Sequence, residues 1–259
     1  MINKPQAFHR SKPYIISVLL VMILIVTAFS SPIQPTGLIH SIPDEQGAFA
    51  FATGTHIGNG IVLTNWHVLK TLASRNEYFR LPLWNEHIYN FDLPIEWVIF
   101  SEKSIDLAIG KLADSRLDRL NVDHACLSAE PVAAGEVLTI TSSPLGRYPP
   151  VEAQVIVTDP SPQPRMDLDP MIKEEKRYAA VSFATLVQPG QEALINSGSS
   201  GGAVTGDDGE LVGLLWTRYD LSDGSMEVLV TPVSAWLPLL EKAEIAPKYK
   251  EHILGQVCK

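Results

Sequence analysis

The sequence predicts a single all-β domain of the sandwich or barrel type. Short β-rich stretches recur along the chain, separated by Gly, Pro, Asn or Asp, and they do not alternate with long helical segments as a βαβ plan requires. The 259 residues, of which 46% are hydrophobic, are enough to bury one sizeable core. We therefore expect one globular domain and no second one.

The expected strands are apolar stretches bounded by turn residues. They cover Ile57 to Val68, Leu93 to Phe100, Leu107 to Leu112, Glu136 to Ile140, Val151 to Val157, Ala179 to Phe183, Gly202 to Val204, Leu211 to Tyr219 and Met226 to Val230. The prolines and aspartates between Thr158 and Met171 predict a loop. A helix is expected from Pro232 to Lys242, with Thr231 as N-cap.

The first 30 residues have the organisation of an export signal. Lys4, Arg10 and Lys12 precede the apolar segment 14–29, and this part of the chain has no acidic residue. The apolar segment is long for a signal-peptide core and short for a membrane span of about 20 residues. Two interpretations stay open: a signal peptide removed before Ser31, or a membrane anchor. Both place the rest of the chain outside the cytoplasm, in the periplasm, outside the cell or on the outer face of the membrane.

The domain organisation follows from these segments. Residues 1–30 are the signal or anchor, and 31–48 are expected to form a linker. The folded domain is expected at 49–240, followed by a C-terminal tail at 241–259.

The charge and the cysteines exclude several classes of function. The net charge is −9 for the whole chain. Three of the 20 Lys and Arg and none of the 29 Asp and Glu lie in residues 1–30, so the part from Ser31 onward carries −12, which disfavours nucleic acid and anionic lipid as partners. Cys126 and Cys258 have no metal-ligand spacing, so neither a metal nor another cofactor is expected. In an oxidising compartment the two cysteines either form one disulfide or remain two structural thiols.

A glycine-flanked serine is the strongest candidate for chemistry. In the run from Asn196 to Gly202, Ser200 stands in a loop where Gly198 can adopt a positive φ and aim its N–H, together with that of Ser200, at one point. Such N–H pairs stabilise an oxyanion, and a serine next to them acts as a nucleophile when a base takes its proton. A plain Gly/Ser surface loop is the alternative.

A histidine and an aspartate supply the partners that such a serine needs. His67 follows an apolar run and is expected at the end of a buried strand, and Asp106 interrupts another apolar strand. Burying a carboxylate costs several kcal/mol unless a partner satisfies it, so we expect Asp106 to pair, with an imidazole as a suitable partner. A structural histidine is the alternative for His67.

In chain order, His67, Asp106 and Ser200 follow the His, Asp, Ser sequence of the chymotrypsin arrangement. On the motifs Thr64 to Val68, Asp106 to Ala108 and Gly198 to Gly202, the chain resembles the trypsin/chymotrypsin-like serine protease superfamily. From Ile195 to Val204 and from Asp208 to Gly213 it is most similar to the HtrA/Deg-type branch, without a PDZ domain.

The resemblance implies a double six-stranded β-barrel with a C-terminal helix. It also implies a serine endopeptidase that hydrolyses peptide bonds in protein or peptide substrates through His67, Asp106 and Ser200, with an oxyanion hole at Gly198 and Ser200. Ser199 departs from the trypsin pattern, in which an aspartate before the nucleophile captures a new N-terminus. Activation by that salt bridge is therefore not expected.

The same resemblance places a substrate pocket beside the nucleophile. Its walls are expected at Leu194, Ile195, Leu214, Leu215 and Trp216. None is charged, so cleavage is expected after small or medium apolar residues unless Arg218 points into the pocket.

Two alternatives to the enzyme stay open. One is a catalytically silent protease-fold binding or scaffold protein of the cell envelope. The other is a membrane-anchored interaction protein in which all three motifs are structural. The sequence leaves the oligomeric state and the natural substrate undetermined.

Overall fold

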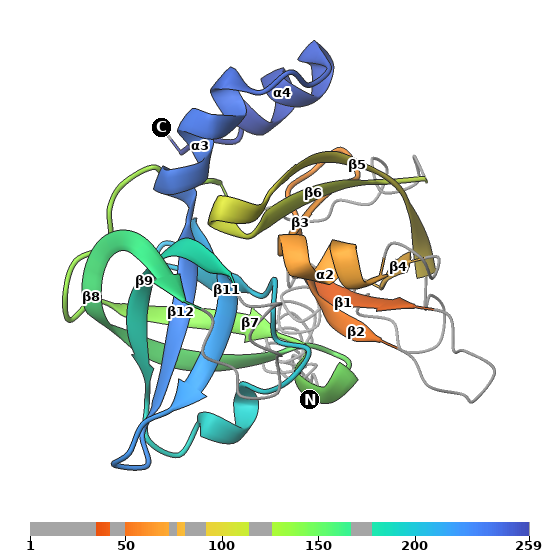
Figure 1. Ribbon diagram of the computed structural model, residues 1–259. Helices are drawn as coiled ribbons and strands as arrows, with labels where there is room; N and C mark the ends of the chain where they lie inside the picture. Colours follow the sequence, from red (N-terminus) through yellow and green to blue (C-terminus); the bar gives the residue numbers. More distant parts are fainter. Residues whose placement is uncertain are drawn as a thin grey trace, which may run out of the picture. The chain divides into compact units, whose positions relative to one another are not determined.

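The structure, a computed structural model, consists of two β-barrels. It describes residues 35–41, 50–72, 77–80, 92–113, 126–166 and 178–258. In the first closed barrel the strands neighbour one another in the order β1-β2-β3-β6-β5-β4, and in the second in the order β10-β11-β12-β9-β8-β7 (Figure 1, orange to yellow and green to blue). The expected all-β fold with two six-stranded barrels and a C-terminal helix is confirmed.

Each barrel is built from one continuous part of the sequence. The first contains β1 (Thr36–Ser41), β2 (Phe51–His56), β3 (Ile61–Thr64), β4 (Glu77–Arg80), β5 (Asp92–Glu102) and β6 (Leu107–Leu112). The second contains β7 (Val137–Ser142), β8 (Val151–Met166), β9 (Ala179–Val187), β10 (Ala203–Thr205), β11 (Leu211–Asp220) and β12 (Met226–Pro232). The helical elements are α2 (Trp66–Leu72), α3 (Val233–Lys242), α4 (Pro247–Leu254) and the 3-10 turns η1 (Lys103–Ile105), η3 (Pro144–Gly146) and η5 (Glu192–Leu194).

A hydrophobic core shared by both barrels lies against the C-terminal helices. It combines buried side chains of β3 and β6 with Leu211 and Leu214 of β11 and with Trp236 and Leu240 of α3. The face of α3 that the sequence marks as apolar is therefore buried. Burial of these apolar side chains away from water stabilises the contact between the two barrels.

The strand before His67 and the start of the C-terminal helix differ from the sequence prediction. The strand expected from Ile57 to Val68 is shorter, because β3 covers only Ile61–Thr64 and the chain then turns into α2. His67 therefore stands in the first turn of a helix, not at the end of a strand. At the other helix, β12 extends through Pro232, and this proline, not Thr231, is the N-cap of α3.

The prediction of a loop between Thr158 and Met171 is wrong up to Met166, because β8 continues to that residue. Prolines remove backbone donors and are tolerated where a strand pairs on one side only. Strand β7 pairs with β8 up to Ile156, and beyond that point the described pairing of β8 is with β9, for example Pro164 with Val181.

The expected linker and tail also contain regular structure. Residues 36–41 form β1, which pairs with both β2 and β4 and closes the first barrel. This segment has only two aliphatic side chains in a row, which is too short a pattern to predict a strand. The tail 241–259 contains α4, whose Ile253 is buried in the shared core.

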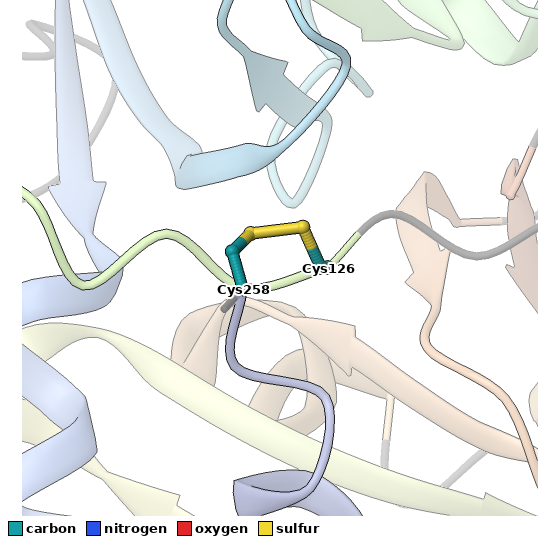
Figure 2. Close-up of a disulfide and its surroundings, with 2 residues drawn as sticks. All are labelled: Cys126 and Cys258. Carbon is teal, nitrogen blue, oxygen red and sulfur yellow. A yellow bond between two sulfur atoms is a disulfide. The ribbon is translucent and has the colours of Figure 1, made fainter.

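A disulfide bond joins Cys126 to Cys258 across 132 positions of the sequence (Figure 2). The neighbouring Leu127 pairs with Val257 and with Leu211, so the C-terminal segment lies alongside the segment that enters the second barrel. Of the two alternatives that the sequence left open for the cysteines, the structure has the disulfide.

Thr53 of β2 connects the first barrel to the loop that contains Ser200. Its N–H donates to the Ser200 carbonyl at 2.9 Å, and its hydroxyl donates to the Gly198 carbonyl at 2.7 Å. Gly201 has a φ of +83°, and a Cβ at this position would lie 2.2 Å from the Thr53 carbonyl oxygen. Only glycine permits this approach of loop and strand.

The described residues contain no helix with the length and apolar character needed to cross a membrane. The segment 14–29, on which the export prediction rests, lies outside the described residues.

Removal of the disulfide should weaken the fold. Replacing both Cys126 and Cys258 by serine is expected to lower the free energy of unfolding by about 2 to 4 kcal/mol, because the unfolded chain regains the entropy that the cross-link removes. Denaturant unfolding with and without reductant measures this. Reductant should destabilise the wild type and leave the double variant unchanged; an equal response of both proteins would contradict the prediction.

Gly201→Ala should destabilise the protein far more than Gly224→Ala. Both glycines have a positive φ, +83° and +85°, but a Cβ at Gly224 meets nothing within 4 Å. The control therefore carries only the backbone strain of about 1 to 2 kcal/mol, whereas Gly201→Ala adds the collision with the Thr53 carbonyl. Denaturant midpoints compare the two variants, and equal losses would show that the close approach is absent.

Candidate active site

His67 and Asp106 form a hydrogen-bonded pair. The His67 Nδ1 lies 2.8 Å from Asp106 Oδ2, and the backbone N–H of His67 donates to Asp106 Oδ1 at 3.0 Å. The Asp106 side chain has no solvent exposure, whereas that of His67 is 31% exposed. The carboxylate is therefore enclosed, and the imidazole reaches from it toward the surface.

The backbone of Asp106 reinforces this pairing. Asp106 caps η1 in a left-handed conformation, with φ of +46°, directly before β6. Its carbonyl accepts hydrogen bonds from the Trp66 N–H and from Asn65 Nδ2, both at 3.1 Å. Both the backbone and the side chain of Asp106 thus hold the first turn of α2. These contacts fix the position of His67 and the orientation of its ring.

Tyr178, which the sequence analysis did not identify, completes the surroundings of the carboxylate. Its hydroxyl donates to Asp106 Oδ1 at 2.6 Å and lies 3.0 Å from His67 Nδ1. Trp216 Nε1 in turn donates to the Tyr178 hydroxyl at 3.2 Å. No local motif marks Tyr178, which only precedes a predicted strand, so its role appears only when the two barrels are brought together.

The two neighbouring serines of the loop have different environments. The Ser199 hydroxyl accepts from the Asn196 N–H and from Ser142 Oγ, both at 3.1 Å, and the residue is 1% exposed. Ser200 is partly exposed, and its hydroxyl donates to the Trp216 carbonyl at 3.3 Å. Ser199 therefore supports the loop from within, while Ser200 is the more exposed of the two serines.

The structure links Ser200 to the His67–Asp106 pair through Trp216 and Tyr178. The Trp216 carbonyl receives the Ser200 hydroxyl, and the Trp216 indole holds the phenol that contacts both members of the pair. His67 and Asp106 come from the first barrel, and the other three come from the second. The site is thus assembled at the junction of the barrels.

The loop also presents two backbone N–H groups. Gly198 has a φ of +92°. The N–H groups of Ser199, Gly201 and Gly202 donate to carbonyls at 2.9 Å, while those of Gly198 and Ser200 have no acceptor among the residues that the structure describes. These two are the groups that the sequence analysis assigned to an oxyanion hole.

The five residues expected to line a substrate pocket do not share one surface. Leu214 belongs to the core beneath α3, Ile195 and Leu215 belong to the interior of the second barrel with Leu194 packed against it, and Trp216 packs with Tyr178. Adjacent strand residues point to opposite faces, so Leu214 and Leu215 cannot line the same pocket.

Arg218 is tied to the loop that leads to Ser200. Its Nη1 donates to the Ile195 carbonyl at 2.7 Å, and its Nη2 lies 3.4 Å from Asn196 Oδ1.

Among the described residues, no three His, Cys, Asp or Glu side chains gather in a group that could hold a metal ion.

Comparisons with known proteins agree with this architecture. The Rv3671c protease of M. tuberculosis in its active form superposes with a TM-score of 0.58 at 17% identity, covering 94% of this chain and 96% of the other. The MamO protease domain of Magnetospirillum magneticum, in its apo form, gives a TM-score of 0.56 at 15% identity, covering 82% and 97%. At such identities the likeness concerns the fold.

No curated protein matches the chain in sequence. The model of the trypsin-like peptidase domain matches residues 52–214, which is more than half of the sequence. With its two six-stranded barrels and the junction at which His67, Asp106 and Ser200 lie, this chain belongs to the trypsin-like peptidase domain family.

Proposed function

We propose that the chain is an exported serine endopeptidase. Ser200 attacks the carbonyl carbon of the scissile peptide bond, and His67 takes the hydroxyl proton and then gives it to the leaving amine. Water hydrolyses the resulting acyl-enzyme by the same route, which restores Ser200. The observation that carries the proposal is the enclosed Asp106 carboxylate, which accepts from both the backbone and the ring of His67.

The proposed roles require one tautomer of His67. A proton on Nδ1 satisfies Asp106 Oδ2, and the lone pair is then on Nε2, the nitrogen that acts as the base. Once Nε2 has taken the proton from Ser200, the charged imidazole lies against the Asp106 carboxylate. This electrostatic interaction lowers the energy of the transition state relative to an isolated imidazole.

The proposal assigns the oxyanion to the N–H groups of Gly198 and Ser200. The positive φ of Gly198 and the hydrogen bonds from Thr53 to the Gly198 and Ser200 carbonyls hold the loop in one conformation. N–H groups preorganised in this way stabilise developing charge without reorganisation during the reaction.

A catalytically silent binding protein with the protease fold is the second candidate. It is favoured by one observation, the hydrogen bond from the Ser200 hydroxyl to the Trp216 carbonyl. For catalysis, the Ser200 hydroxyl must donate to His67 Nε2 in the substrate complex instead of to the Trp216 carbonyl. Catalytic hydrogen bonds often form only in such complexes, so this geometry does not argue against the enzyme.

For the substrate we propose proteins or peptides cleaved after small or medium apolar residues. The proposal rests on the sequence around the nucleophile, because none of the five positions expected beside Ser200 carries an acidic side chain that would attract Lys or Arg. The guanidinium of Arg218 is engaged by the Ile195 carbonyl and lies near Asn196 Oδ1, so it is not directed at a substrate side chain. Export is proposed on the basic and apolar pattern of residues 1–30.

Ser200→Ala should abolish covalent labelling by a fluorophosphonate and all peptide hydrolysis. The melting temperature should change little, because the variant loses one partly exposed hydroxyl. The matched control is Ser199→Ala, which should still take the label but melt at a lower temperature, because the buried Ser199 hydroxyl accepts two hydrogen bonds. Labelling of Ser199 in place of Ser200 would contradict the assignment. A wild type that takes no label would favour the silent binding protein.

Cleavage in a peptide library should follow Val, Ala, Leu or similar residues, as read by mass spectrometry of the products. Burying a Lys, Arg or Glu side chain without a counter-charge costs several kcal/mol, whereas each buried methylene contributes about 0.8 kcal/mol. The preference among apolar residues should be graded, because one methylene changes it by only about 1 to 3 kcal/mol. Dominant cleavage after Glu would indicate that the Arg218 guanidinium leaves the loop to bind substrate.

A further inference from the structure

The Tyr178 hydroxyl contacts both members of the acid–base pair, although the mechanism above does not use it. Tyr178 is 8% exposed, and its hydroxyl donates to Asp106 Oδ1 at 2.6 Å. A phenol has one proton to donate. Because the carboxylate receives it, the hydroxyl oxygen is an acceptor toward Trp216 Nε1 at 3.2 Å and toward the nearby His67 Nδ1–H.

The ring of Tyr178 is fixed by its neighbours. Trp66 packs edge-on against it with ring centroids 5.3 Å apart, and Trp216 packs at 5.8 Å. The ammonium group of Lys103 lies 5.5 Å from the Trp66 ring centre and 5.6 Å from that of Tyr178. With the ring held in this way, the hydroxyl reaches Asp106 without a further loss of side-chain entropy.

We propose that Tyr178 is a positioning residue of the peptidase; this inference rests on the function proposed above. Asp106 Oδ1 accepts from the His67 backbone N–H and from the Tyr178 hydroxyl, and these two bonds prevent the carboxylate from rotating about its Cβ–Cγ bond. Oδ2 therefore stays directed at Nδ1, which keeps the proton of His67 on that nitrogen. The phenol sets the catalytic tautomer through the aspartate.

Tyr178 also moderates the charge that Asp106 presents to His67. A short hydrogen bond to a carboxylate is charge-assisted and draws negative charge toward the oxygen that accepts it. Less charge then remains on Oδ2 to favour the protonated imidazole. Among the residues that the structure describes, the Asp106 carboxylate accepts from Tyr178 and the Lys103 ammonium lies over its ring, and the substitution of Tyr178 by Phe alters neither charged group.

The test compares Tyr178→Phe with the wild type. The variant keeps the ring and loses the hydroxyl. Its kcat should fall about 10- to 100-fold, the factor that corresponds to one hydrogen bond to a charged group, with KM nearly unchanged. The midpoint of its pH–rate profile should move to higher pH, because the carboxylate then favours the charged imidazole more strongly.

Tyr219→Phe is the matched control. Tyr219 packs against the same hydrophobic cluster as Tyr178, and the control substitution likewise removes a phenol hydroxyl. Among the described residues, the Tyr219 hydroxyl makes no contact with Asp106 or His67. Its kcat and pH midpoint should match those of the wild type. Wild-type kinetics in Tyr178→Phe, or an equal loss in both variants, would overturn the positioning role.

A second measurement keeps the inference testable if the wild type has no activity, an outcome that would refute only the proposed function. The imidazole Nδ1–H of His67 should give a downfield proton NMR signal in the wild type, assigned by its loss in His67→Ala. In Tyr178→Phe this signal should move, because the carboxylate that accepts the Nδ1 proton has lost its hydrogen bond from the phenol. An unchanged signal would overturn the inference whatever the activity.

Discussion

The enclosed carboxylate of Asp106 is the constraint on which the site depends. A charge without solvent exposure is tolerated only where donors surround it. Here the donors are the backbone and ring of His67 and the phenol of Tyr178, and they come from both barrels. The need to satisfy one buried charge thus orients the histidine and also selects how the two barrels meet.

The remaining contacts between the barrels hold the loop that contains Ser200 in a fixed position relative to the Asp106 carboxylate. Thr53 is the main one, because its N–H and hydroxyl both donate to carbonyls of the loop, and its hydroxyl also accepts from the Ser143 N–H. Apolar packing around Trp236 and Leu240 of α3 contributes the attraction between the two barrels that has no directional preference. Nondirectional burial holds the barrels together, and a few directional hydrogen bonds set their alignment.

Much of this could be predicted from the sequence because the signals are local. The apolar stretches separated by turn residues predict the strands, and the contexts of His67, Asp106 and Ser200 each point to chemistry within a few residues. Tyr178 could not be found in this way, since its partners lie 111 and 72 positions away. For the same reason the proline-rich half of β8 looked like a loop, because the one-sided pairing that permits its prolines is a tertiary property.

The expected pocket shows a different limit. The family resemblance suggested both Leu214 and Leu215 as pocket residues, but the alternation of a strand sends neighbouring side chains to opposite faces, one toward the core beneath α3 and one into the barrel. The pairing of the cysteines needed the fold as well, because only the path of the C-terminal segment beside Leu127 brings them together.

The contiguity of each barrel has a consequence for biosynthesis. A ribosome releases all strands of the first barrel before any strand of the second, and domains generally fold in the order of their synthesis. A chain that has folded only its first barrel contains the histidine and the aspartate, but it lacks the serine, the phenol and the indole that are linked to them. Whatever reactivity the finished protein has therefore arises only when the second barrel docks on the first.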